Sequence, residues 1–93
     1  MIRSFKDSDA ECIFNAMPSR RFSGGVYRSA RRKLLLLDVA DCIDDLRIPP
    51  GNRLEKLKGN RKGQYSIRVN ERWRVCFLFS AGDARHVEIV DYH

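Results

Sequence analysis

Residues 64–93, QYSIRVNERWRVCFLFSAGDARHVEIVDYH, decide the fold. Three runs of alternating apolar and polar residues cover this stretch, separated by the short turn sequences Asn70-Glu71 and Ala81-Gly82-Asp83. Period-two alternation is typical of half-buried strands, and turns this short join antiparallel neighbours. The stretch therefore predicts a three-strand antiparallel meander, with strands over residues 64–69, 73–79 and 85–92.

The alternation also assigns side chains to the two faces of the predicted sheet. One face is apolar and consists of Tyr65, Ile67, Val69, Trp73, Val75, Phe77, Phe79, Val87 and Ile89. We expect the other face to be uncovered and to carry Arg68 and Arg74. The last residues, Asp91, Tyr92 and His93, follow directly on the third strand, so we expect them close to these arginines.

The preceding residues predict a strand, two helices and a basic loop. Residues 2–6 alternate enough for a first strand, and Asp7 or Ser8 can cap a helix over residues 9–16. A long helix is predicted over residues 26–46, with a core-facing stripe of Leu35, Val39, Cys42, Ile43 and Leu46. The sequence therefore predicts a single α+β domain over residues 1–93, with an N-terminal strand, two helices and the meander packed on the helices.

Composition narrows the class of protein. No apolar run approaches the roughly 20 residues of a membrane span, and the N-terminus shows no secretory signal. The cysteines Cys12, Cys42 and Cys76 are far apart and form no C-x-x-C pair, so we expect neither a metal nor a redox cofactor. A reducing, cytoplasmic location is the default expectation.

The net charge of +6 favours an anionic partner, either nucleic acid or an acidic protein. Basic residues form two blocks, one from Arg20 to Lys33 with no acid and one from Arg53 to Arg74 with only two acids. The alternative for the first block is an ordinary solvated face. If it does bind a partner, Arg28, Arg31 and Arg32 are the expected docking residues.

The residues around the meander suit phosphodiester chemistry or plain phosphate binding. RNA carries its own nucleophile, the 2′-hydroxyl, so cleavage needs a base, an acid and cations on the phosphate, without a metal. Histidine can exchange protons near neutral pH, and arginine and lysine can hold a phosphate. The alternatives are a frayed terminal His93, a surface His86 and an Asp91 that only pairs with an arginine.

The chain resembles the HigB toxins of the RelE superfamily, which belong to type II toxin–antitoxin systems. The resemblance rests on the loop LKGNRKG over residues 57–63, the strand WRVCF over residues 73–77 and the final residues VEIVDYH. It implies a ribosome-dependent, metal-independent mRNA endoribonuclease. It also implies a HigA-like helix-turn-helix antitoxin as partner, with operator DNA bound only through the toxin–antitoxin complex.

The resemblance also implies roles for particular residues. His93 would transfer a proton, Arg74 and Lys58 would hold the phosphate, Tyr92 would stack or orient, and Asp91 would position its neighbours. The surrounding basic residues expected to bind RNA are Arg68, Arg61, Lys62 and Lys56. Glu55 departs from the family, because some members carry a histidine three residues before the loop lysine.

Two other functions compete with the nuclease. A non-enzymatic inhibitor could use the same basic surface to bind a macromolecule such as the ribosome or DNA gyrase, the target of a sister branch of the superfamily. A small RNA-binding module without chemistry is the third hypothesis, and the lack of interleaved exposed aromatic residues argues against it.

Overall fold

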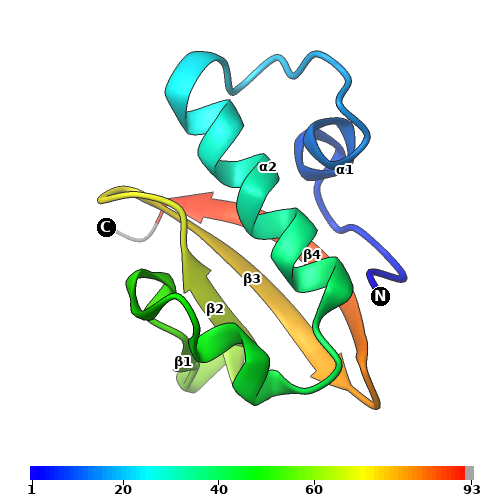
Figure 1. Ribbon diagram of the computed structural model, residues 1–93, viewed down its shortest axis with the longest axis vertical. Helices are drawn as coiled ribbons and strands as arrows, with labels where there is room; N and C mark the ends of the chain where they lie inside the picture. The colour runs from blue at the N-terminus through cyan, green and yellow to red at the C-terminus, as the bar shows by residue number, and fades with distance from the viewer. Residues whose placement is uncertain (92–93) are drawn as a thin grey trace.

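A four-strand antiparallel sheet in the order β1-β2-β3-β4 forms the frame of the computed structural model, which describes residues 1–91. Helix α2 crosses one face of this sheet, and helix α1 lies beside α2 (Figure 1). The strands are β1 (Glu55–Lys56), β2 (Tyr65–Arg68), β3 (Trp73–Ser80) and β4 (Asp83–Asp91). The helices are α1 (Ser8–Phe14), α2 (Gly24–Val39) and the short 3-10 turns η1 (Ile43–Arg47), η2 (Pro50–Asn52) and η3 (Gly59–Arg61).

The predicted meander is confirmed. β2 pairs with β3, and β3 pairs with β4, both antiparallel. The Asn70 side chain closes the first turn, because its oxygen accepts hydrogen bonds from the backbone N–H groups of Arg72 and Trp73. The second turn uses two residues with positive φ, Ala81 and Gly82, as tight hairpins require.

One irregularity interrupts the alternation predicted for the third strand. The register of β3 against β4 shifts between Cys76 and Leu78, and His86 has a φ of 54°. A bulge of this kind adds a residue to one strand, so that Arg85 and His86 are both exposed before Val87 returns to the core. Val87 and Ile89 are buried as predicted.

The predicted N-terminal strand is not a full strand of the sheet. Ile2 and Phe5 form only isolated parallel bridges to Ala84 and Val87. The bulge explains this break, because at His86 the backbone N–H turns to the hydroxyl of Ser4 instead of a main-chain carbonyl. The fourth strand, β1, comes instead from the basic loop, where Leu57 is buried.

The long helix is shorter than predicted, and its buried stripe is a different one. It ends at Val39, since Ala40 is extended, and Ile43–Arg47 forms a separate 3-10 turn. Ala30, Leu34 and Leu37 face the core, whereas the predicted stripe residues Leu35 and Val39 are 38% and 71% exposed. Four consecutive leucines, residues 34–37, offer an apolar side chain in every direction around the helix, so the sequence pattern could not select the buried ones. No helix among residues 1–91 combines the length and apolar character of a membrane span.

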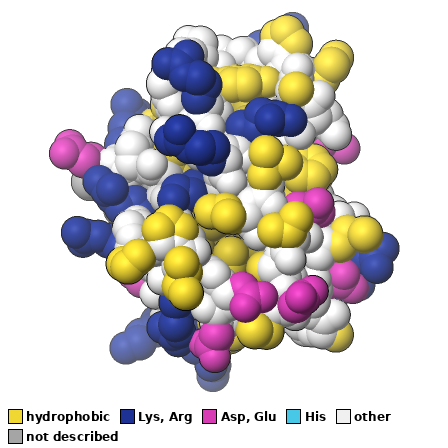
Figure 2. All heavy atoms as spheres, viewed as in Figure 1, with side chains coloured by type: hydrophobic (Ala, Val, Ile, Leu, Met, Phe, Trp, Pro, Cys, Tyr) yellow, Lys and Arg dark blue, Asp and Glu magenta, His cyan; other side chains and the backbone are white. Residues whose placement is uncertain are grey.

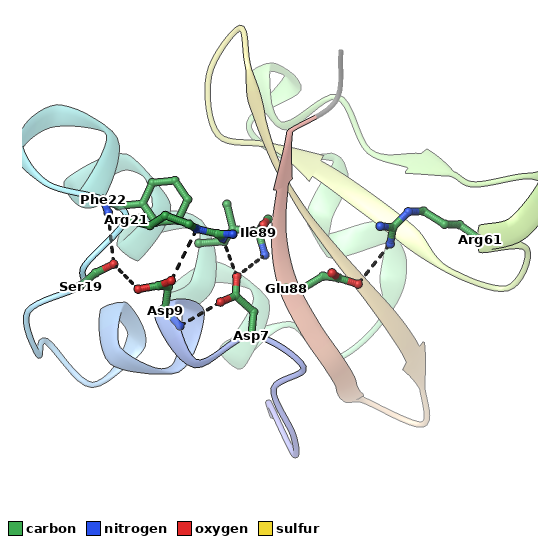
Figure 3. A network of polar contacts seen from close by, with 8 residues as sticks. All are labelled: Asp7, Asp9, Ser19, Arg21, Phe22, Arg61, Glu88 and Ile89. Atoms are coloured by element: carbon green, nitrogen blue, oxygen red, sulfur yellow. Dashed lines mark hydrogen bonds and ion pairs between the residues drawn. The ribbon is translucent and has the colours of Figure 1, made fainter.

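A network of charged groups joins the N-terminal segment to β4 (Figure 3). Asp7 caps α1 by accepting from the backbone N–H of Asp9, and its carboxylate also accepts from the N–H of Ile89 and from Arg21 at 2.8 Å. The Arg21 guanidinium donates in addition to the Ile89 carbonyl oxygen, at 3.0 Å, and lies over the ring of Trp73. Because these contacts link residues more than sixty positions apart, the network fixes the last part of β4.

Asp9 gives this network a pH dependence. The Ser19 hydroxyl donates to its carboxylate at 2.7 Å, and this bond, with the nearby Arg21, holds the pKa of Asp9 below its ordinary 3.8. A depressed pKa contributes stability that is present above the ordinary value and is lost as pH falls through the folded-state value. We therefore expect Asp9→Asn to lower the free energy of unfolding at pH 6, and we expect the difference from the wild type to shrink below pH 4. Urea titrations at both pH values measure it, and a difference that stays constant down to pH 3 would contradict the assignment.

Candidate functional site

Arg74 lies at the centre of the sheet face opposite α2, and it is buried. Only 6% of the residue is exposed, which corrects the prediction that it stands on an uncovered face. Its Nε donates to the Ser66 hydroxyl at 2.9 Å, and one Nη donates to the Arg53 carbonyl oxygen at 2.6 Å. A carboxylate oxygen of Glu55 is 3.9 Å from the same Nη. We call these four residues the Arg74 cradle.

Residues 53–64 bury this face by folding back over it, and we call them the cover segment. Ser66 and Cys76, which share the face with Arg74, are both fully buried. Arg61 of the cover segment reaches β4, where its guanidinium is 3.2 Å from Glu88, on the side of the strand away from the helices (Figure 3). Arg61 was predicted to bind RNA, but its side chain is thus already engaged within the protein.

Cations that are available to a ligand lie at the rim of the cradle. Lys56, Lys58 and Lys62 are exposed and make no ion pair with another residue of the described chain. Together with Glu55, Lys56 and Lys58 line a shallow depression of about 400 Å³, and Lys56, Lys58 and Lys62 line a second one of about 280 Å³. Arg68 is half-buried and pairs in register with Arg74. The predicted loop lysines therefore lie together at the β1 edge of the sheet, and Arg68 and Arg74 share one face of it.

The end of β4 brings Asp91 to this region. Val90 is the register partner of Arg74, and Asp91 is the partner of Trp73. The Asp91 carboxylate accepts from Nε of Arg72 at 2.8 Å, so it pairs with an arginine, which was one of the two alternatives for it. The predictions for Tyr92 and His93 lie outside the described residues.

The side of the molecule that carries α2, shown in Figure 2, is rich in positive charge along one flank. Basic side chains gather along the flank where β1 and β2 lie and over the upper part of α2, while acidic ones gather at the lower end (Figure 2). Lys33 of α2 belongs to this flank: burial and the charges of Arg32 and Arg68 lower its pKa. Burial raises the pKa of the Cys76 thiol, which makes it a poor nucleophile beside Arg74.

Sequence reasoning missed three members of the site. Ser66 and the Arg53 carbonyl hold Arg74, and Arg72 holds Asp91. Strand alternation does place Ser66 on the same face as Arg74, so this residue was visible in the sequence, whereas Arg72 lies just before β3 with its guanidinium over the ring of Trp73. The Arg53 carbonyl had no such signal, because it reaches Arg74 only through the path of the cover segment. A metal-binding group of three His, Cys, Asp or Glu residues is absent from residues 1–91.

The arrangement places a buried positive charge behind exposed lysines, which suits the binding of a phosphate. A buried guanidinium with satisfied hydrogen bonds is a fixed positive charge, and exposed lysines at its rim can neutralise further phosphate oxygens. Glu55, with its side chain 47% exposed, adds a carboxylate between Arg74 and the lysine depression. Among the described residues, the site thus combines several cations with one carboxylate, that of Glu55.

The fold is that of the RelE-like toxins. The chain superposes on the toxin–antitoxin complex YoeB–YefM from Staphylococcus aureus with a TM-score of 0.63 at 18% identity, covering 100% of this chain and 95% of that chain. It superposes on YafQ from E. coli strain BL21(DE3) with a TM-score of 0.64 at 14% identity, covering 99% and 92%. These identities are low, so the likeness concerns the fold.

The chain belongs to the HigB-like toxin family, described as RelE-like toxins of type II toxin–antitoxin systems, whose model matches residues 3–93. Toxin HigB-1 of Vibrio cholerae serotype O1 is 42% identical over 85 residues, which cover 90% of each chain. Endoribonuclease HigB of Proteus vulgaris is 33% identical over 97 aligned positions that span both chains.

Proposed function

We propose that this protein is an endoribonuclease that cuts mRNA on the ribosome without a metal ion, and that a HigA-like antitoxin neutralises it. The observation that carries the proposal is the Arg74 cradle, which holds a buried cation next to the end of β4 and within a rim of exposed lysines. Support also comes from the Proteus vulgaris relative, which is named an endoribonuclease.

The cleavage chemistry assigns a task to each group. The 2′-hydroxyl oxygen attacks the adjacent phosphorus and gives its proton to a base, while the 5′-oxygen takes a proton and leaves. The products are a 2′,3′-cyclic phosphate and a free 5′-hydroxyl, so no water, metal or cofactor enters the step. Arg74 and Lys58 neutralise the charge that builds on the phosphate oxygens.

We assign the two proton transfers to the last residues and to Glu55. Histidine is the side chain whose ordinary pKa lies closest to neutral pH, so His93 is assigned one of the two protons. Glu55 is a carboxylate near Arg74 and in the lysine depression, so it can take the other. Tyr92 stacks on a base or orients a donor, and Asp91, whose carboxylate accepts a hydrogen bond from Arg72, positions its neighbours.

We assign the RNA contacts outside the reacting phosphate to residues at the rim of the Arg74 cradle. Lys56, Lys62 and Arg68 offer side chains that a neighbouring phosphate can reach, whereas Arg61 contributes mainly by holding the cover segment against β4. The ribosome presents the mRNA, and operator DNA is bound only through the antitoxin.

The test is primer extension on an mRNA that is being translated in a reconstituted system. We expect the wild type to cut within codons, only when ribosomes are present, and we expect His93→Gln to lower the cutting by about 100-fold or more. Tyr27→Phe, which is remote from the cradle, serves as control and should cut like the wild type. Uncut mRNA with a wild type that still arrests growth would overturn the proposal, and inhibition of gyrase supercoiling would then be measured.

A further inference from the structure

The outer face of α2 is a row of exposed residues that point away from the sheet. Arg28, Arg32, Leu35 and Val39 follow one another at helical spacing (i, i+4, i+7, i+11), opposite the buried Ala30, Leu34 and Leu37. The row has two arginines in its first half and two apolar residues in its second half. We refer to these four residues as the outer face of α2.

The first half of this face is basic, and its arginines line a depression. Arg28, Arg31 and Arg32 make no ion pair within the described chain, and the first turn of α2 contains no acidic residue. Nε of Arg31 is buried and has no hydrogen-bond partner among the described residues. With Tyr27 and Leu35, the three arginines line a depression of about 270 Å³.

The second half of the face is apolar. Val39 is 71% exposed and Leu35 is 38% exposed, although both lie on a well-formed helix that has core positions elsewhere. The removal of each such side chain from water is favourable in free energy. Exposed apolar residues aligned with arginines on one helix face are typical of a surface that receives a protein.

We propose that the outer face of α2 is the docking site for an acidic amphipathic helix of the cognate antitoxin. The inference rests on the proposed function only in that an antitoxin partner exists. A helix fits because α2 is 16 residues long, about 24 Å, and offers anchors at helical spacing along its whole length. The docking helix carries acidic residues where it meets Arg28, Arg31 and Arg32, and apolar residues where it meets Leu35 and Val39.

Charge and polarity distinguish this partner from RNA. A phosphate backbone would use the arginines but would leave Leu35 and Val39 in water, whereas an amphipathic helix covers both halves. Helix α2 crosses one face of the sheet (Figure 1) and packs on the core with Val75 and Phe77, whereas Arg74 lies on the other face, so substitutions on the outer face of α2 leave the cradle unchanged. Binding of the antitoxin and cleavage of RNA can therefore be tested separately.

The experiment is calorimetric titration of the purified toxin with its own purified antitoxin, at two salt concentrations. We expect Arg28→Glu/Arg32→Glu to weaken binding by about 100-fold or more and to reduce its salt dependence, because the charge pairs are lost. Leu35→Ser/Val39→Ser should weaken binding by about 10-fold or more and leave the salt dependence as it is. Arg20→Glu/Arg47→Glu makes the same change of charge at exposed positions elsewhere and should stay within about twofold of the wild type.

Each other outcome has a definite meaning. Affinity that is unchanged in both α2 variants would overturn the proposal. Loss of ribosome-dependent cleavage in Arg28→Glu/Arg32→Glu, with unchanged antitoxin affinity, would assign the surface to RNA and would also overturn it. If the wild type does not cut mRNA at all, the proposed nuclease function fails, yet the titration still decides the docking site, because it measures binding alone.

Discussion

Replacing Arg74 with methionine is expected to abolish ribosome-dependent cleavage and to lower the free energy of unfolding by about 3 kcal/mol. Methionine is about as long as the aliphatic part of arginine, so it fills the space but donates no hydrogen bond. The Ser66 hydroxyl and the Arg53 carbonyl then lose their partner in a buried position, which is costly. Both quantities are measured on the same purified variant, by primer extension and by urea titration.

Lys58→Met is the matched control for this variant. Lys58 is exposed at the rim, so its loss should change the free energy of unfolding by no more than about 0.5 kcal/mol while cleavage still falls. Ser66→Ala keeps the guanidinium but removes one of its acceptors, and should lower cleavage less than Arg74→Met does. An Arg74→Met protein that cuts like the wild type would show that the cradle only stabilises the fold.

Replacing Asp7 with alanine should destabilise the protein by about 3 kcal/mol, although Asp7 lies at the far side of the sheet from the cradle. One carboxylate caps α1, accepts from the backbone N–H of Ile89 and pairs with Arg21. Loss of a helix cap costs about 1 kcal/mol, and an unpaired Arg21 and Ile89 N–H add to it. Urea unfolding of Asp7→Ala and of Arg21→Met, singly and together, gives the coupling between them.

Asp44 provides the comparison, because it is also an aspartate paired with an arginine. Its side chain is 76% exposed, against 14% for Asp7, so Asp44→Ala should change stability by no more than about 0.5 kcal/mol. Equal losses for Asp7→Ala and Asp44→Ala would mean that the network in Figure 3 does not stabilise β4.

Local sequence features predicted the parts of the fold that local forces decide. The alternation of residues 64–93, the turn residues and the cap at Asp7 led to the correct meander and, within one residue, to the start of α1, because period and turn chemistry act between near neighbours; the helix ends at Phe14, two residues before the predicted end. Strand alternation alone also placed Arg68 and Arg74 on the same face of the sheet, where the two residues pair in register. The resemblance to HigB toxins, carried by three short motifs, led to the family.

Tertiary structure decided which of these surfaces are covered. The cover segment helps to bury Arg74, and its own Arg61 pairs with Glu88 of β4; neither contact follows from alternation, because each joins residues more than twenty positions apart. The same holds for the helix: four adjacent leucines suit several orientations, and the packing of α2 on the sheet chose Leu34 and Leu37 and left Leu35 and Val39 exposed. Sequence by itself determined the strands and turns of the meander, because these depend on local sterics, but not the pairing of the N-terminal segment or of β1. Only the fold decided which cations are fixed supports and which are free to bind a partner, because this depends on contacts between segments far apart in the chain.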